Sequence, residues 1–387
     1  MLTIVPTIDV EGTHGEDPFS QLIIGEIGEP ETWGVHRLSQ TFQDYGVRAT
    51  FFVDCYEHTF WGNDKMEEVC QKLVEANQDV QLHTHPAWRD DIHDSPWLRT
   101  LKRTDSFFPQ ELDLMAKLSL SQQVEVLEFG ADLIQKWVGY RPVVHRSGGY
   151  SINQQTVRAL VKTGFLMDSS MNTAHSNSKI NWSFNSLRLK DGLLECPVTV
   201  LNYTFGLPLG FTNLPLYSKK MKTDLDSCTV EDITSYVRQS RDMGIKILNL
   251  FMHSYSLLKF DPFFRNIQPD PSDLQKLQTI LADLSGMQDV RFMSCIDLLR
   301  AYQKNREDDL VTAPPAFSTE NRPLEGATQR ETYGCIKQAK IFVVVGNVHR
   351  DQLSSYQLML QTCTETPALE RHVRSVSTPE GQGVLNP

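Results

Sequence analysis

Two histidines separated by one residue lie in the stretch QLHTHPAW, residues 81–88. They are His83 and His85, and they follow a short strand-like run at 80–82. Side chains at positions i and i+2 of an extended chain point to the same side. Two imidazoles placed in this way can hold one metal ion, and they can equally line a groove.

Other polar side chains follow further strand-like runs along the chain. They are Asp9, Glu11, Asp54, Arg146, Asp168 and His253. The carboxyl ends of parallel strands in α/β folds share one face, and active sites lie on that face. We therefore expect these groups to meet the histidine pair at one rim. The two glycines after Arg146 allow close approach of the backbone, and we expect Arg146 to orient a carboxylate.

Composition excludes several classes of function. The chain has 387 residues and a formal net charge of −11, which argues against nucleic acid or an anionic membrane as the main partner. The seven cysteines form no CxxC motif, so neither a disulfide framework nor a structural zinc site is expected. The start, MLTIVPTIDVEG, is typical of a first strand and not of a signal peptide. No apolar run approaches the roughly 20 residues of a membrane span. We expect a soluble, cytoplasmic protein without membrane insertion, whose oligomeric state stays open.

Strand-like and helix-period segments alternate over residues 1–305. This alternation predicts a parallel α/β architecture. A closed or slightly broken (β/α) barrel is the first interpretation, and a doubly wound open sheet is the second. Residues 306–330 are rich in Pro, Thr, Glu and Asp and are predicted to be a linker, followed by a small or loosely ordered extension at 331–387. A long insertion at 87–118 is expected to cover the rim.

Six segments, in this order, resemble the motifs of the polysaccharide deacetylase family, the NodB-homology domains of the carbohydrate esterase 4 type. They are TIDVEG, ATFF, LHTHPAW, HRSGGYS, the Asp168-Ser169-Ser170 triplet and LNLFMHSYSL, and they span roughly residues 1–300. The resemblance implies a distorted (β/α)7 barrel, here with a short C-terminal extension. It also implies a metal-dependent hydrolase that removes N-acetyl groups from acetylamino sugars.

The resemblance also assigns roles by position. Asp9 matches the general base that acts on water, and Arg146 matches the arginine that keeps this base ionised. His253 matches the histidine that protonates the leaving amine. His83 matches a metal ligand. We assign substrate binding to three further motif residues, which are Asp168, Trp88 and Tyr150.

Two departures from the family pattern affect the metal site. Val10 stands where the family has a metal-binding aspartate, and the two histidines are separated by one residue instead of three. Either Glu11, His83 and His85 form a rearranged site, or the metal has been lost. Two histidines and one carboxylate suit zinc, and cobalt or nickel as well.

The predicted function is N-deacetylation of an acetylated sugar, in a glycan precursor for surface-polysaccharide synthesis. One alternative is hydrolysis of another C–N bond, as in a deformylase or a ureide amidohydrolase, possible without a metal. The other is a non-catalytic carbohydrate-binding or scaffold barrel, which the Val10 departure motivates.

Overall fold

The computed structural model describes residues 1–12, 19–28, 30–56, 65–86, 113–209, 212–261 and 266–304. The chain divides into two units, Met1–Phe317 and Ser318–Pro387. The second unit lies outside the described residues, so the linker at 306–330 and the extension at 331–387 stay predictions. No described helix has the length and apolar character needed to cross a membrane.

The described strands form one large sheet and two small ones. The strands are β1 Leu2–Val10, β2 Thr50–Asp54, β3 Asp79–Thr84, β4 Val144–Ser147, β5 Met167–Asp168, β6 Arg188–Lys190, β7 Leu193–Glu195, β8 Val200–Leu209, β9 Thr212–Lys222, β10 Ile247–His253, β11 Leu258–Lys259, β12 Gln268–Pro269 and β13 Val290–Phe292. The large sheet has the order β10-β1-β2-β3-β4-β5-β7-β6, with β13 also paired to β1. The pairs β8–β9 and β11–β12 stand apart from it.

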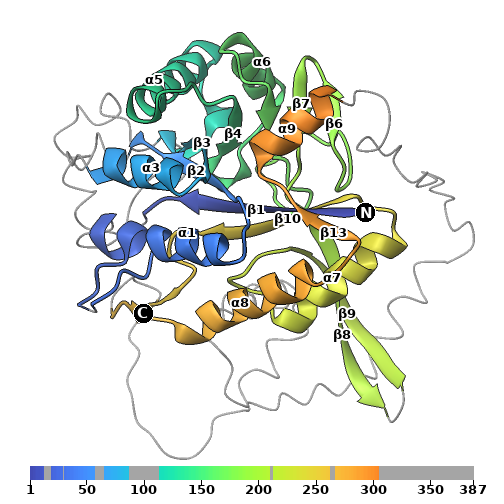
Figure 1. Cartoon of the computed structure of the whole chain (residues 1–387). Helices are drawn as coiled ribbons and strands as arrows, with labels where there is room; N and C mark the ends of the chain where they lie inside the picture. The colour runs from blue at the N-terminus through green and yellow to red at the C-terminus, as the bar shows by residue number, and fades with distance from the viewer. Residues whose placement is uncertain are drawn as a thin grey trace, which may run out of the picture. The chain divides into compact units, whose positions relative to one another are not determined.

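Helices connect most of these strands (Figure 1). The α-helices are α1 Val35–Asp44, α3 Lys65–Glu75, α5 Leu120–Val138, α6 Gln154–Lys162, α7 Val230–Asp242, α8 Pro271–Ser285 and α9 Cys295–Lys304. A π-helix, η1, spans Phe19–Ile24, and two 3-10 turns are η5 Met115–Lys117 and η6 Gly148–Tyr150. Several helices end in capping residues of the types that favour a helix terminus. Thr229 and Asp232 form a capping box at the start of α7, and Gly139 ends α5 in the left-handed conformation.

The sheet has the topology of a singly wound barrel. Strands β10, β1, β2, β3, β4, β5 and β7 are parallel neighbours, and from β1 to β7 their order in the sheet follows the chain. Right-handed crossovers that always advance in one direction place every helix on the same side of the sheet. A doubly wound sheet would reverse its strand order. The predicted distorted (β/α)7 barrel is confirmed, and the doubly wound alternative is wrong.

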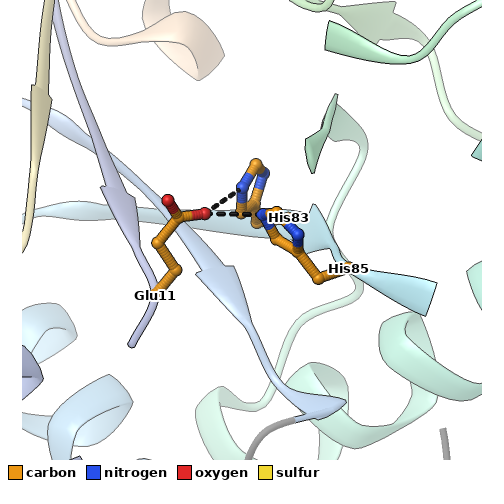
Figure 2. A group of neighbouring side chains, drawn as sticks. All are labelled: Glu11, His83 and His85. Atoms are coloured by element: carbon orange, nitrogen blue, oxygen red, sulfur yellow. Dashed lines mark hydrogen bonds and ion pairs between the residues drawn. The ribbon is translucent and has the colours of Figure 1, made fainter. Parts of the chain in front are cut away.

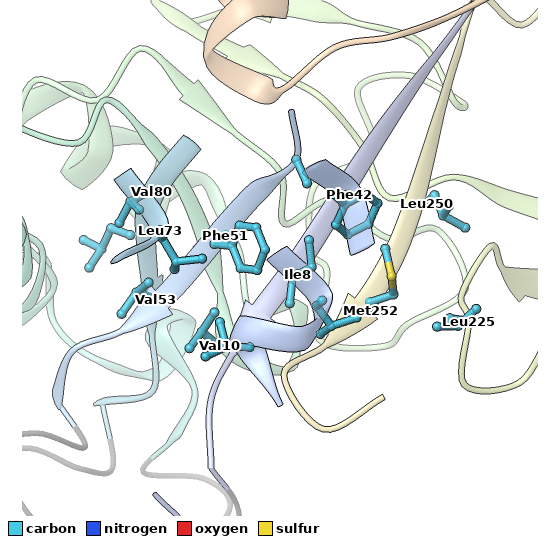
Figure 3. Packing of buried hydrophobic residues seen from close by; sticks show 14 of the residues in the cluster. Ile8, Val10, Phe42, Phe51, Val53, Leu73, Val80, Leu225, Leu250 and Met252 are labelled. Atoms are coloured by element: carbon cyan, nitrogen blue, oxygen red, sulfur yellow. The ribbon is translucent and has the colours of Figure 1, made fainter. Parts of the chain in front are cut away.

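The outer face of the sheet packs against the helices. Ile8, Val10, Phe51 and Val53 belong to one buried cluster with Phe42 of α1, and Figure 3 shows these side chains together. The buried face of α3 joins the same cluster through Met66, Val69, Cys70 and Leu73, which recur at helical spacing. This apolar layer fixes the register of each strand, because a slip by one residue would move its core side chains to the other face.

The inner face of the barrel is apolar at one end and polar at the other. Val5, Phe52, Val144 and Met167 pack with Leu298 and other side chains of α9. The start of α9 is held by hydrogen bonds from Cys295 N to Thr50 Oγ1 and from Ile296 N to Asp79 Oδ2. Since Thr50 and Asp79 begin β2 and β3, α9 closes the amino end of the barrel. The polar groups gather at the carboxyl end.

The apolar run LLECPVTVL, residues 193–201, is typical of one strand, but it divides into β7 and the start of β8. The sequence analysis also missed the long antiparallel hairpin β8–β9. Apolar residues alternate along 201–209, which is typical of a strand. Pro208 and Gly210 are typical of turns and loops, and they weakened this pattern. The base of this hairpin fills the space beside β10, where Phe251 N donates to Thr223 O and Leu225 N donates to Phe251 O.

Candidate metal centre and catalytic groups

Strand register brings the predicted polar residues together at the carboxyl end of the barrel. Asp9 of β1 lies opposite His253 of β10, and Asp54 of β2 lies opposite His83 of β3. His83 in turn lies opposite Arg146 of β4. Adjacent strands are about 4.8 Å apart, so groups far apart in sequence become neighbours.

Glu11, His83 and His85 form a compact cluster of possible metal ligands. Glu11 Oε2 lies 2.9 Å from His83 Nε2 and 2.7 Å from His85 Nε2. Figure 2 shows both imidazole rings turned toward this single carboxylate oxygen. One oxygen and two nitrogens therefore converge on one point.

The Nδ1 atom of each histidine ring already has a hydrogen-bond partner. His83 Nδ1 donates to the backbone carbonyl of Arg146 at 2.9 Å, and His85 Nδ1 donates to Asp113 Oδ2 at 2.6 Å. A proton on Nδ1 leaves the lone pair of a neutral imidazole on Nε2, the atom that faces Glu11. Second-layer acceptors of this kind orient metal-binding histidines in general. Two nitrogen lone pairs and one carboxylate oxygen face each other in this arrangement. A positive charge between them would stabilise it, and a divalent cation fits that need.

The titration behaviour of the cluster has the same cause. Burial alone would raise the pKa of Glu11, but the charge of His85 and hydrogen bonds to both histidines lower it well below its ordinary value. Burial alone would lower the pKa of His85, but Asp113 and Glu11 raise it well above its ordinary value. The carboxylates favour a positive charge at this place.

The burial of Val10 bears on how a carboxylate reaches the two histidines. Val10 is fully buried in the outer core beside the helices. Side chains alternate along a strand, so Asp9 and Glu11 turn to the side opposite Val10. Glu11 thus lies on the same side as Asp9, one residue beyond the end of β1.

Asp9 and Arg146 form a buried ion pair beside this cluster. Arg146 Nη1 donates to Asp9 Oδ1 at 2.7 Å, and Asp9 Oδ2 lies 3.7 Å from His83 Nε2. Arg146 is fully buried, with its guanidinium 4.4 Å from the Phe52 ring centroid. Its other donors reach the carbonyl and hydroxyl oxygens of Ser169. Arg146 is therefore fixed in place with its guanidinium against Asp9.

His253 approaches the cluster from β10. Its Nδ1 bonds to Asp226 Oδ2 at 2.7 Å, and its Nε2 lies 3.7 Å from Glu11 Oε1. Its ring stacks on Tyr255, with centroids 4.8 Å apart. Burial alone would lower the pKa of His253, but the hydrogen bond and charge of Asp226 raise it. The raised pKa favours the protonated ring, whose Nε2 faces the cluster.

Asp168 lies deeper, in a fully buried polar network. Its Oδ1 accepts from His145 Nδ1 at 2.7 Å and from Ser170 Oγ at 2.9 Å. Its strand register places it opposite Glu195, which is also fully buried. Burial and the charge of Asp168 raise the pKa of Glu195 well above its ordinary value. The assignment of Asp168 to substrate binding stays a prediction.

The protonated Glu195 predicts an unusual pH dependence. Above about pH 4.3 the unfolded state ionises this carboxyl group, whereas the folded state keeps it protonated. Folding stability is therefore lost as pH rises, with a slope approaching about 1.4 kcal/mol per pH unit until the folded pKa is reached. Gln at this position would still accept from Met171 N, as Glu195 Oε1 does, and would not ionise. We expect Glu195→Gln to gain stability over the unmodified protein between pH 5 and pH 8, measured by urea unfolding. The exposed Glu75→Gln is the control, and a difference independent of pH would contradict the prediction.

Gly148 has no side chain, and this leaves room for the ring of His85 in the candidate metal site. A Cβ at this position would lie 2.4–2.6 Å from the His85 ring atoms Cε1, Nε2 and Nδ1. The close approach expected for the two glycines after Arg146 is thus found at Gly148. We expect Gly148→Ala to displace His85 and weaken divalent-metal affinity about 10- to 100-fold, measured by competition with a chelator. Gly286→Ala is the matched control, because its Cβ would meet neighbours at an ordinary 3.5 Å. Equal metal affinity in both variants would contradict the prediction.

The remaining predicted residues differ in their placement. Tyr150 is half-buried, and its hydroxyl accepts from Lys222 Nζ at 3.1 Å. Trp88 lies outside the described residues. Asp54 is fully buried next to the histidine strand, and burial raises its pKa to about 7. One of its oxygens, Oδ2, has no hydrogen-bond partner among the described residues.

Sequence analysis missed several residues that support the site. They are Asp113, His145, Glu195, Lys222, Asp226 and Tyr255. His145 and Glu195 had a recognisable signal, because each is a polar residue at the end of an apolar strand-like run. Asp113 and Asp226 lie in connecting segments without a local pattern, so only the folded chain brings them to the histidines.

Comparisons with known proteins bear on the fold. No family model and no curated protein matches the chain. A proposed polysaccharide deacetylase from Mycobacterium smegmatis is 18% identical, with 81% of this chain and 94% of that chain covered and a TM-score of 0.49. Puue allantoinase is 13% identical, with 80% and 92% covered and a TM-score of 0.50. A CE4-family pseudoenzyme from Bacillus anthracis is 12% identical, with 77% and 65% covered and a TM-score of 0.38. At these identities the similarity concerns the fold, and the allantoinase has a comparable arrangement of the chain.

Proposed function

We propose that this protein is a metal-dependent hydrolase that removes the N-acetyl group from an acetylamino sugar. The observation that carries the proposal is the convergence of Glu11 Oε2 with the Nε2 atoms of His83 and His85, next to a buried Asp9–Arg146 pair. Zinc is the expected ion, and cobalt or nickel suit the same ligands. A divalent ion held there would polarise the amide carbonyl and acidify water.

The side chains around the cluster suit the proton transfers of amide hydrolysis. Asp9 takes a proton from the attacking water through Oδ2, because Arg146 bonds to its Oδ1. His253 donates a proton from Nε2 to the departing nitrogen, since Asp226 holds its Nδ1. These two transfers convert an amide and water into a carboxylic acid and a free amine.

The substrate assignment rests on the family motifs in the sequence. We place the acetylamino sugar in a glycan precursor, nucleotide- or lipid-linked, for surface-polysaccharide synthesis, and we place the protein in the cytoplasm. A second candidate is hydrolysis of a ureide, since a protein of similar fold is named an allantoinase.

A substrate panel tests the proposal directly. The full chain is loaded with zinc, cobalt or nickel and incubated with N-acetylated, N-formylated and ureido compounds, with release of the acid and the amine measured for each. Acetate release from acetylamino sugars supports the deacetylase. Turnover of only the ureido or only the formyl compounds would replace it with the corresponding amidohydrolase. Glycan binding without any turnover, unchanged in Asp9→Asn, would indicate the non-catalytic alternative.

A further inference from the structure

A cleft of about 510 Å³ lies beyond the catalytic groups and has no role in the proton transfers above. The segment after β5 and the base of the β8–β9 hairpin form much of its wall. The residues that give it chemical character are Asn172, Thr173, His175, Asn181, Phe184 and Lys220.

The lining of this cleft contains no Asp or Glu, although the chain has a net charge of −11. Lys220 is exposed and makes no ion pair within the described part of the chain, and its ammonium lies 5.7 Å from the Phe184 ring centroid. A lysine without a nearby carboxylate attracts an anion. The cleft therefore offers a local positive charge on an acidic protein.

The other polar groups of the cleft are suited to hydroxyl groups. Thr173 Oγ1 is buried and has no hydrogen-bond partner among the described residues. His175 Nδ1 accepts from Asn177 N at 3.3 Å, so a neutral ring carries its proton on Nε2. Asn181 is exposed at the cleft and its amide both donates and accepts. Phe184 adds an aromatic face of the kind that packs against apolar sugar C–H groups.

Contacts between rings connect the cleft with the catalytic groups. His175 contacts Tyr150, with centroids 5.2 Å apart, and Tyr150 lies 6.0 Å from Phe251. Phe251 contacts His253 at 4.8 Å. On β9, Lys220 and Lys222 are two residues apart and so share a face about 7 Å apart. Lys222 bonds to Tyr150, which also contacts His175, so the cleft is next to the candidate catalytic groups.

We propose that this cleft is a subsite for a negatively charged, hydroxyl-bearing part of the substrate, such as a sugar phosphate or a uronate. The anion lies against Lys220 and the sugar hydroxyls face His175 and Asn181. The assignment of this ligand as part of the substrate rests on the proposed function, whereas the binding itself does not.

Binding is measured with probes that contain no amide and so cannot be hydrolysed. Isothermal titration of the full chain uses glucose 1-phosphate, glucuronate and methyl glucoside. We expect Lys220→Met to bind the anionic probe about tenfold more weakly and to bind methyl glucoside unchanged. The better of the two anions distinguishes phosphate from carboxylate. The control is Lys246→Met, which removes an exposed lysine outside the cleft and should bind all probes as the unmodified protein does.

Two results would overturn the subsite. One is equal binding of the anion by Lys220→Met and the unmodified protein, and the other is an equal loss in Lys246→Met, which would indicate a general charge effect. Kinetics separate this failure from failure of the proposed function. With N-acetylglucosamine 1-phosphate, Lys220→Met should raise KM about tenfold at constant kcat, with no change for N-acetylglucosamine. Deacetylation without any Lys220 effect keeps the function and removes the subsite. Lys220-dependent binding without deacetylation keeps the anion site and removes the function.

Discussion

Glu11→Gln is expected to abolish tight binding of a divalent metal and to lower kcat/KM at least about a thousandfold. Glu11 Oε2 is the single oxygen shared by His83 Nε2 and His85 Nε2. An amide in its place is uncharged, so a divalent ion would lose both its anionic ligand and much of the local negative potential. Loss of a directly bound ligand should cost more than the 10- to 100-fold typical of second-layer changes.

The measurement is metal content of the purified full chain, followed by a chelator competition. The unmodified protein should hold about one equivalent, and Glu11→Gln and the double variant His83→Ala/His85→Ala should hold little. The exposed Glu75→Gln controls for the change of residue type and should keep the metal. If the unmodified chain takes up no zinc, cobalt or nickel, then the histidines line a groove and the metallo-hydrolase proposal fails.

Asp9→Asn is expected to lower kcat about 10²- to 10⁴-fold while leaving metal content unchanged. The loss corresponds to removal of a general base, because an amide has no useful proton affinity. The same change leaves Arg146 buried without a charged partner, although the Asn oxygen can still accept its hydrogen bond. Leaving one charge of a buried ion pair uncompensated costs roughly 3–5 kcal/mol, and since the hydrogen bond is kept, the free energy of unfolding should fall by about the lower end of that range.

Three readouts on Asp9→Asn separate catalysis from structure. Turnover, metal content and urea unfolding are compared with Asp283→Asn, which changes an exposed aspartate on α8. Loss of turnover with retained metal supports the base. Loss of metal together with turnover would place Asp9 among the ligands instead, and full activity would exclude it from the reaction.

Alternation of side chains along β1 decides which residues near its end can face the histidines. The valine after Asp9 points into the outer core, so it is a packing residue. Glu11, two residues after Asp9, lies on the side of Asp9, and its longer side chain reaches the histidines from beyond the strand end. The histidine pair follows the same rule, because His83 and His85 are also two residues apart.

The sequence by itself determined the barrel and the polar rim. Alternating periodicities of two and 3.6 residues are local properties, so β1, β2, β3, α3 and α5 could be predicted from short windows. The polar side chains follow these strands directly, and parallel strands must share one carboxyl edge. Asp9, His83, Arg146 and His253 could therefore be expected to be neighbours before any contact was known.

Only the tertiary structure decided the contacts that surround these neighbours. The family resemblance already implied the Arg146–Asp9 pair, whereas His85 bonds to Asp113 from a distant segment. The Glu195–Asp168 pair and the cleft beside Lys220 arise in the same way. Such contacts depend on register between strands and on the path of connecting segments, which no local pattern encodes. Local sequence specifies which groups reach the rim, and long-range packing specifies which of them share a charge, a proton or a metal ion.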